Sequence, residues 1–177
     1  MADPGPDDLF WAFSLTLYGM PGIPAACLEL QDHHGADVNM VLYLLWRARD
    51  GDCLDRDSMA ALDEKLVSWR TEIIHVLRGM RRMLSLSAPA PLSPSEAAAT
   101  RSKIKAAELA AEEAQQRAMA LADPAPTSVG LSREQAGAQM LQDYASLLGS
   151  RFPSAKTSLL IETAASLTED QISQNQE

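Results

Sequence analysis

The sequence contains few of the residues that favour β-sheet. Val and Ile together supply 11 of the 177 residues, whereas Ala and Leu supply 28 and 24. Ala and Leu lose little on entering a helix, while β-branched residues suit strands better. The composition therefore predicts an all-α protein and argues against a β-sandwich, a barrel or a parallel sheet. It also excludes collagen, a disulfide scaffold and wholesale disorder.

Cysteines and long apolar runs are scarce as well. The first eight residues, MADPGPDD, lack the basic and apolar parts of a signal peptide, and the chain has two cysteines, Cys27 and Cys53. Two thiols in an unexported chain are most simply free thiols of a reducing cytosol, so we expect a cytoplasmic protein. The longest strictly apolar run, Met40–Trp46, has seven residues. Spanning a bilayer takes roughly 20, so no membrane span is expected.

Net positive charge is limited to one region of an acidic chain. The net charge is −9, and residues 1–57 and 123–177 carry −7 and −4, whereas residues 58–87 carry +2. A protein that binds nucleic acid needs a basic face to displace counterions from phosphates. Residues 70–82 alone could supply such a face, and the acidic remainder would repel a polyanion. No nucleic-acid partner is therefore expected.

Three helices are predicted before residue 50. The first is apolar nearly all round and ends at Gly19, and the second starts near Pro24 and stops near Gly35. Asp37 then has the position of a cap for a third helix over Val38–Arg47. This third segment is apolar enough to be a buried strand, but its Met, Leu and Trp residues favour a helix.

The strongest periodic signal in the sequence is one apolar stripe with spacings of three and four residues. It consists of Met59, Leu62, Leu66, Trp69, Ile73, Leu77, Met80 and Leu84. Such a stripe predicts a single helix with this side facing the core. The helix would span roughly 40 Å, so a break near Val67–Arg70 is the alternative. Trp11, Trp46 and Trp69 all lie on apolar stripes and are expected in the core.

The second half of the chain alternates between Pro-rich breaks and helices. Residues 85–94 predict a linker, and Ser93 and Glu96 then have the spacing of a capping box for an Ala-rich helix. Its small side chains bury little area, so it packs weakly or closely, or orders only against a partner. We therefore predict a compact multi-helix bundle, residues 1–87, with a more loosely attached helical extension, residues 88–177, whose tail is frayed.

Three segments within residues 8–84 resemble a known family. The pattern is an aromatic first helix, an LQ-x-x-x-G-x-DVN segment before an apolar helix, and a Trp followed by an LR-x-x-R helix. Here these are Phe10, Trp11, Leu30, Gln31, Gly35, Asp37, Val38, Asn39, Trp69, Leu77, Arg78 and Arg81. The pattern resembles a family of short bacterial proteins classed as a domain of unknown function. The resemblance covers about half of the chain and implies a helical cytosolic protein without any assigned activity.

The densest polar cluster near the predicted buried helices has two interpretations. It consists of Gln31, Asp32, His33, His34, Asp37 and Asn39. Imidazole and carboxylate groups are common ligands, so the cluster could bind a small molecule or a metal ion. Alternatively it is a helix end followed by a cap, with the histidines facing water. A zinc site shared with the cysteines lacks the usual ligand spacing, so no metal and no cofactor is predicted.

The one basic surface also has two interpretations. Arg70, Arg78, Arg81 and Arg82 supply it. Guanidinium groups bind carboxylates and phosphates bidentately, which suggests a docking surface for an acidic partner. Alternatively, the arginines offset a helix dipole or pair with the acidic half of the same chain. Exposed ion pairs are worth about 0–1 kcal/mol, so these arginines are expected to matter little to folding.

Catalytic motifs are absent from the sequence. It contains no G-x-S-x-G, no P-loop, no G-x-G-x-x-G and no H-E-x-x-H, and no catalytic residue is predicted. His75 lies among apolar neighbours and is expected to be partly buried and structural. The sequence therefore favours a non-catalytic helical interaction protein, an adaptor, assembly factor or regulator, with a protein partner or a second copy. The alternative is a small-ligand-binding protein or an enzyme with a polar site near Gln31–Asn39.

Overall fold

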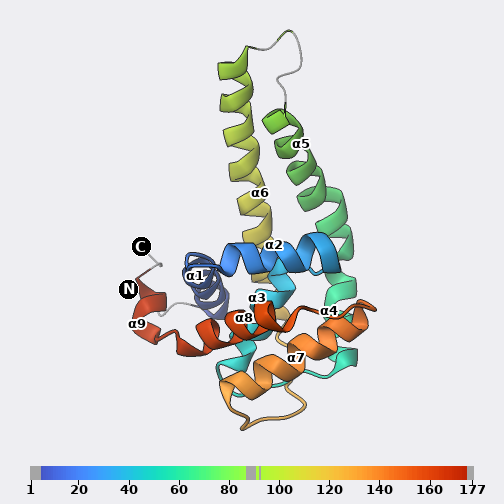
Figure 1. The fold of residues 1–177 in the computed structure, drawn as a ribbon, viewed down its shortest axis with the longest axis vertical. Helices are drawn as coiled ribbons and strands as arrows, with labels where there is room; N and C mark the ends of the chain where they lie inside the picture. The colour runs from blue at the N-terminus through green and yellow to red at the C-terminus, as the bar shows by residue number, and fades with distance from the viewer. Residues whose placement is uncertain (1–4, 87–90, 92, 175–177) are drawn as a thin grey trace. The chain divides into compact units, whose positions relative to one another are not determined.

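The computed structural model describes residues 5–86, 91 and 93–174, without the side chains of residues 6–8. All regular elements in these residues are helices (Figure 1), which confirms the predicted all-α fold. The chain forms two compact units. Unit 1 combines residues 1–63 with residues 116–177, and unit 2 consists of residues 64–115.

The helices follow one another along the chain with short connections. Unit 1 contains α1 (Pro6–Tyr18), α2 (Ile23–His34), α3 (Val38–Ala48), the start of α4 (Arg56–Trp69), the end of α6 (Pro94–Ala122), α7 (Arg133–Leu147), α8 (Ser154–Ser166) and α9 (Glu169–Ser173). Unit 2 contains the end of α4, a π-helical turn η1 (Arg70–Ile74), α5 (His75–Leu86) and most of α6.

Several helices start at the capping residues that the sequence predicts. The Asp37 side chain accepts the N–H of the second residue of α3 at 2.9 Å. Ser132 and Gln135 form the reciprocal capping box of α7. Before α6, the Ser93 N–H donates to the Glu96 carboxylate at 2.9 Å, and the Glu96 N–H donates to the Ser93 hydroxyl at 3.3 Å. Each cap satisfies backbone donors that the first helical turn leaves without partners.

Helix α3 lies at the centre of unit 1. It packs against α1, α2, α7 and α8, and residues 40–45 along it are all buried. A helix that is apolar on all sides needs neighbours on all sides. The preference for a helix over a buried strand in this segment is confirmed.

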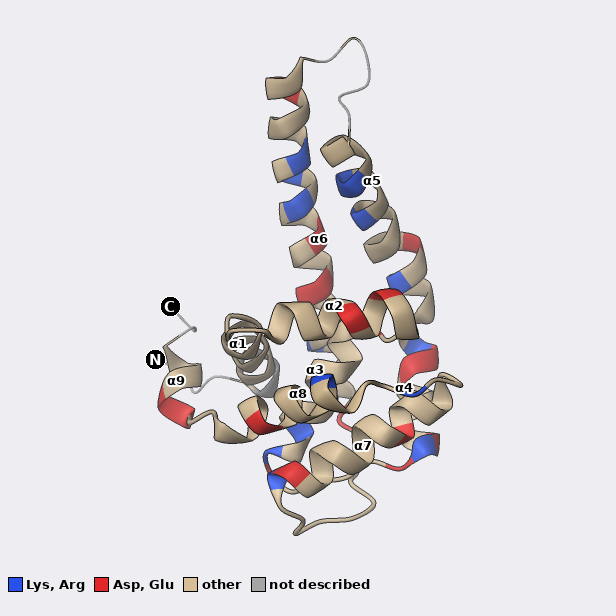
Figure 2. Ribbon diagram, viewed as in Figure 1, with Lys and Arg blue, Asp and Glu red and all other residues tan. Residues whose placement is uncertain are grey.

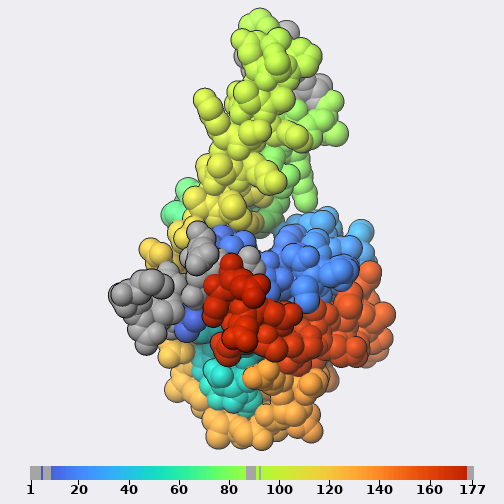
Figure 3. Space-filling view, turned by 90° about the vertical axis from the view of Figure 1, so that its left-hand side faces the viewer, coloured from blue at the N-terminus to red at the C-terminus, as the bar shows by residue number. Residues whose placement is uncertain are grey.

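The C-terminal helices belong to the core of unit 1. Helices α7 and α8 pack on α3, α8 also packs on α2, and α9 packs on α1. In the space-filling view of Figure 3 the red C-terminal segment lies against the blue N-terminal one. Met140, Tyr144 and Leu160 are at most 2% exposed. The sequence analysis placed these helices in a loosely attached extension that begins at residue 88. In the structure they are part of the core, because their apolar faces are buried against helices distant in sequence.

The predicted linkers and tail are described in part. Residues 87–90 and 92 of the 85–94 linker, and with them the predicted 87/88 boundary, lie outside the described residues. Backbone hydrogen bonds connect the Pro-rich segment after α6 to the segment around Cys53, whose N–H donates to the Ser128 carbonyl at 2.9 Å. Thr168 and Gln171 form a capping box for α9, so the predicted fraying does not extend to this turn.

Unit 2 is a helical hairpin in which α5 and α6 run in opposite directions (Figure 1). Polar contacts join its two helical arms. The Trp69 indole N–H donates to the Ala111 carbonyl at 3.0 Å, and Arg78 and Arg81 reach Glu108. Long side chains thus connect α6 to the helical arm formed by α4, η1 and α5.

The π-helical turn η1 changes which side of the following helix is buried. An extra residue in a turn rotates the residues after it by about 100° relative to an uninterrupted α-helix. Ile74 is therefore buried, whereas Ile73 and Met80, on the predicted inward stripe, are exposed. The predicted break near Val67–Arg70 thus takes the form of a π turn beginning at its end.

The prediction of one inward stripe from Met59 to Leu84 holds as far as Leu66 and is wrong for three of the residues beyond it. The prediction that Trp69 lies in the core is also wrong, since Trp69 is 41% exposed and only its indole N–H is tied to α6, through the Ala111 carbonyl. Trp11 and Trp46 are half-buried.

Candidate functional site

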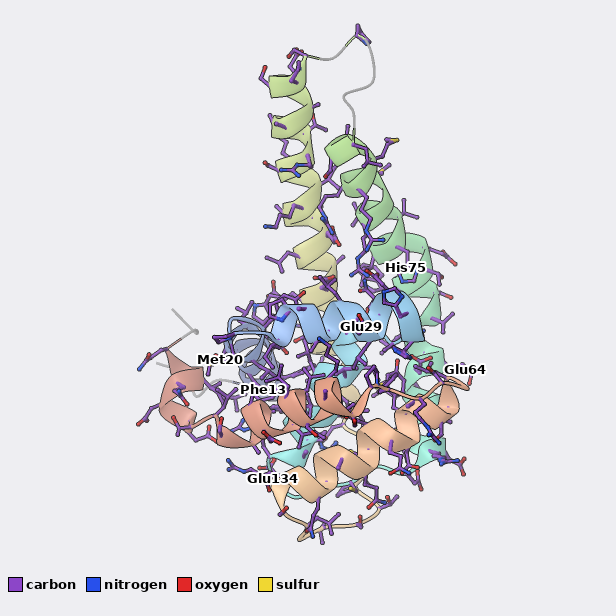
Figure 4. All side chains as sticks on the ribbon, in the orientation of Figure 1. Phe13, Met20, Glu29, Glu64, His75 and Glu134 are labelled. Atoms are coloured by element: carbon purple, nitrogen blue, oxygen red, sulfur yellow. The ribbon has the colours of Figure 1, made fainter. Side chains whose placement is uncertain are left out.

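The outer part of the predicted polar cluster lies at the exposed C-terminal end of α2. Asp32 and His33 are exposed, and the Gln31 amide donates to the Asp32 carboxylate at 3.0 Å. The His33 ring lies 4.0 Å from the carboxylate of Glu29, which Figure 4 labels on the same helix. These side chains interact along the surface of one helix.

His34 points to a different part of unit 1. Its Nδ1 lies 3.1 Å from the hydroxyl of Ser150 in the α7–α8 connection. The imidazole also makes an edge contact with the Phe152 ring, with centroids 6.0 Å apart. His34 thus joins the end of α2 to a segment more than a hundred residues away.

Asp37 and Asn39 take part in interior contacts of unit 1. The Asp37 N–H donates to the Tyr144 hydroxyl at 3.0 Å while its carboxylate caps α3. Asn39 is buried, and its side-chain oxygen accepts a hydrogen bond from the Gln116 amide at 2.8 Å. The six residues of the predicted cluster therefore divide among an exposed helix end, a contact with the α7–α8 connection, and a cap with interior bonds.

Two of the four predicted arginines pair with α6 inside unit 2. Arg78 donates to Glu108 at 3.0 Å and to Glu112 at 2.7 Å, and Arg81 donates to both carboxylate oxygens of Glu108. Arg78 is 18% exposed and Glu108 is 7% exposed. These ion pairs are largely shielded from water, which differs from the expectation that the arginines contribute little to folding. Their partners lie on α6 rather than in the acidic N-terminal half.

The electrostatics of this junction depend on the charge of Glu108. Burial alone would raise the pKa of the Glu108 carboxyl, but hydrogen bonds from Arg81 and Arg78 and their positive charges outweigh burial. The pKa therefore lies below its ordinary value of 4.5, and Glu108 is charged at neutral pH.

The rest of the basic surface spreads over both helices of the hairpin. Arg70 is half-buried and Arg82 is exposed. Helix α6 adds exposed cations that the sequence prediction missed, because they lie outside the 70–82 segment: Arg101, Lys103 and Lys105. Figure 2 shows these blue segments on α5 and α6 toward the turn of the hairpin.

Unit 2 also carries an apolar surface that the sequence analysis assigned to the core or overlooked. We define the exposed stripe as Trp69, Ile73, Val76, Met80 and Met83, whose exposure ranges from 38% to 55%. The π-helical turn η1 lies within this set, so Val76, Met80 and Met83 share one side of α5, whereas Trp69 and Ile73 lie on a side rotated by about 100°. His75, which was expected to be partly buried, is exposed beside it on the same helical arm (Figure 4).

A buried cation in unit 1 was missed entirely. The Arg47 guanidinium donates to the Tyr43 hydroxyl, to Asp52 and Asp123, and to the Pro124 carbonyl, at 2.9–3.2 Å. Burial would lower the pKa of Arg47, but these hydrogen bonds and charges outweigh burial and raise it. Arg47 thus connects α3 to the loop that follows α6. In the sequence, its position at the end of an apolar run was the only local indication that it is buried.

The titratable side chains show no arrangement typical of a metal centre. No three His, Cys, Asp or Glu side chains converge within the part of the chain that the structure describes. Cys27 and Cys53 are both buried free thiols, and burial raises the pKa of Cys27 to about 12. Among the described helices, none has both the length and the apolar character that crossing a bilayer requires.

Comparison with known proteins gives one match. A family model described as a protein of unknown function (DUF2390) matches residues 9–119. The match continues past residue 84, where the resemblance seen in the sequence ended, and it includes most of α6. No curated protein and no solved structure matches the chain.

Proposed function

The chain belongs to this family of unknown function, and we propose that it is a non-catalytic helical protein-interaction protein of the cytoplasm, an adaptor, assembly factor or regulator. Family membership brings no activity with it, so the proposal rests on the chemistry of the surface. The free, buried thiols are consistent with a reducing compartment.

The distribution of exposed apolar side chains carries the proposal. Of the 14 large apolar side chains that are exposed among the described residues, seven lie between residues 67 and 86. Single exposed apolar residues are ordinary, but a contiguous group typically marks an interaction surface. The exposed stripe accounts for five of the seven, and Val67 and Leu86 are the other two.

Unit 2 also carries exposed positive charge, which suits protein recognition. The turn side of the hairpin carries the exposed cations Arg82, Arg101, Lys103 and Lys105. A charged rim around an apolar centre is the usual anatomy of a protein interface. The rim sets orientation and the rate of association, while the apolar centre contributes most of the affinity.

The proposal is tested by affinity purification of the 177-residue chain from its native cells. Three proteins are compared: the wild type, a stripe variant with Val76→Gln, Met80→Gln and Met83→Gln, and a control with Leu28→Gln and Leu147→Gln. The control side chains are exposed to a similar degree but lie on α2 and α7. Partners retained by the control and lost by the stripe variant support the proposal. The same bound set for all three proteins, or a stoichiometric metabolite without a protein, contradicts it.

The contact between His34 and Ser150 favours a second candidate, a small-ligand or catalytic site at the end of α2. A hydroxyl within hydrogen-bond distance of an imidazole is the arrangement of a nucleophile and its base. In the described structure, however, the other ring nitrogen of His34 has no carboxylate partner to orient it. Labelling of Ser150 by a fluorophosphonate, lost in His34→Gln, would favour this candidate, and absence of labelling would count against it.

A further inference from the structure

We propose that the side of α5 formed by Val76, Met80 and Met83, the α5 face, binds an acidic amphipathic helix of another protein. The inference rests on the proposed function, because it assigns the chemistry of the partner to part of the same surface. The three side chains are 46–55% exposed. All three follow the π-helical turn, so ordinary α-helical geometry places them within about 60° of one another around the helix axis.

Helix α5 turns charged side chains toward α6 and leaves apolar ones outside. Arg78 and Arg81 lie roughly 130–170° around the helix from the middle of the α5 face, and both reach the glutamates of α6. Leu77 and Leu84, at the edge of the face, are half-buried. A surface helix ordinarily packs its apolar side on its neighbours and exposes its charges. The α5 face is therefore an apolar surface that its own hairpin leaves open.

The size and shape of the α5 face suit a helix. Its three side chains span about 10 Å along α5, and their spacing of four and three residues is the one by which helices recognise each other. Two of the three are methionines, whose flexible side chains adapt to a partner. Gly79 lies on the same side, and a Cβ atom added there would meet nothing within 4 Å. The missing side chain leaves room for a large side chain of the bound helix.

The charges near the α5 face favour an acidic partner. Residues 73–95 contain three Arg and no Asp or Glu. Arg82 is exposed one helical turn from Gly79. Arg101 of α6 donates to the Ser85 hydroxyl at 3.1 Å, which places its guanidinium beside the end of α5. Carboxylates that flank the apolar side of a bound helix would meet these cations, whereas Lys or Arg in the same places would meet like charge.

The ion pairs of the hairpin favour a protein over a lipid surface. A helix that lies on an anionic membrane uses the Lys and Arg of its polar side to reach the headgroups. In α5, Arg78 and Arg81 are held by Glu108 and Glu112 instead. These carboxylates offset the arginine charge and would themselves be repelled by anionic lipid. A protein helix needs only a few local counter-charges, so it is the occupant that fits.

Photo-crosslinking from position 80 identifies the occupant in native cells. Benzoylphenylalanine replaces Met80 in the 177-residue chain, and mass spectrometry sequences the segment that it captures on irradiation. The expected segment has an excess of Asp and Glu and apolar residues three and four apart. The same probe at Leu28, a similarly exposed position on α2, is the control and should not capture this segment. Placement at Met83 repeats the test if circular dichroism shows that the first variant is unfolded.

A synthetic peptide of the captured segment then measures the two parts of the recognition by fluorescence anisotropy. Met80→Gln is expected to weaken binding about tenfold, because it places a polar group in the apolar centre. Arg82→Glu with Arg101→Glu should weaken binding about tenfold in about 20 mM salt and by less than about twofold in about 500 mM salt, which screens exposed charges. Arg151→Glu with Lys156→Glu reverses two charges in unit 1 and is expected to leave binding unchanged.

The outcomes separate this inference from the proposed function. A captured segment that is basic, that is not helical or that belongs to a second copy of this chain overturns the inference, as does the absence of capture from both positions. Binding that salt and the arginine variants leave unchanged overturns the acidic partner. Sedimentation with vesicles containing about 30% phosphatidylserine, lost in Met80→Gln, would make a lipid surface the occupant and overturns it too. If affinity purification still yields a stripe-dependent protein partner, the proposed function stands without this inference. If it yields none, both fail.

Discussion

Replacing Glu108 with glutamine removes one negative charge from the centre of unit 2 and keeps the shape of the side chain. Glu108 accepts hydrogen bonds from both Arg78 and Arg81, and its side chain is 7% exposed. Glutamine retains one oxygen acceptor, but its amide nitrogen then faces a guanidinium. The variant therefore leaves two partly buried cations with weaker partners.

The expected cost is about 2 kcal/mol. Hydrogen bonds to charged groups contribute about 1.5–3 kcal/mol, and breaking a fully buried ion pair costs about 3–5 kcal/mol. The value lies near the lower end because Arg81 is 31% exposed and water replaces part of its lost interaction. At room temperature, 2 kcal/mol corresponds to roughly a 30-fold change in the equilibrium between closed and open states.

Hydrogen exchange followed by mass spectrometry resolves this change within the chain. Protection is expected to fall about 30-fold in peptides from α5 and from the α6 segment 100–115, and to stay constant in peptides from α3. Glu113→Gln is the matched control, because it makes the same substitution on α6 where no ion pair is described. Equal effects of the two variants would refute the idea that the arginine–glutamate junction stabilises unit 2.

The pH dependence follows from the same carboxylate. Because the pKa of Glu108 lies below its ordinary value of 4.5, its contribution to stability is present above that value and disappears as the pH falls through the lower, folded-state pKa. The difference in protection between the wild type and Glu108→Gln should therefore be full at about pH 7 and should decrease as the pH is lowered below 4.5. A difference that persists unchanged at the lower pH would show that charge is not its origin.

Three further predictions concern unit 1. Arg47→Met should lower the free energy of unfolding by about 2 kcal/mol, measured by urea denaturation, because the buried Tyr43 hydroxyl loses its donor and the loop after α6 loses its anchor; an unchanged midpoint would refute this. Gly51→Ala should lower the free energy of unfolding by at least about 2 kcal/mol more than Gly35→Ala does. Both glycines have φ above 70°, but a Cβ at position 51 would lie 2.5 Å from the Leu131 carbonyl oxygen, whereas a Cβ at position 35 would meet nothing within 4 Å. The Cys27 thiol, with a pKa of about 12, should not react with a disulfide reagent at about pH 8 until denaturant is added, and rapid reaction of the folded chain would contradict its burial.

The parts of the fold that sequence reasoning predicted are those that neighbouring residues decide. A cap such as Asp37 or Ser132 acts on backbone groups two or three residues away, so the sequence shows both partners. The apolar run in α3 likewise predicts burial on every side, although it does not show which helices cover it.

The parts that it missed depend on residues far apart in the chain. The hydroxyl that accepts the Asp37 N–H belongs to Tyr144, and no local pattern relates the two. The arginine partners on α6 lie about 30 residues away, and the choice among many glutamates is made by packing. The sequence allowed a break near Val67–Arg70 but did not show that it is a π turn at Arg70–Ile74, because the extra residue changes the orientation of the residues after it and leaves the spacing of apolar residues in the sequence the same.

Unit 1 joins two stretches of sequence with residues 64–115 between them, and this order has a consequence during synthesis. The apolar sides of α3 leave the ribosome long before α7 and α8, which cover them, have been made. At about 5–20 residues per second, the interval between the end of α3 and the end of α8 is roughly 5–25 s. For that time the nascent chain holds an uncovered core segment, which is the kind of surface that ribosome-associated chaperones bind. A release of the chain before α8 would therefore yield a protein that aggregates, even though more than half of its helices are complete.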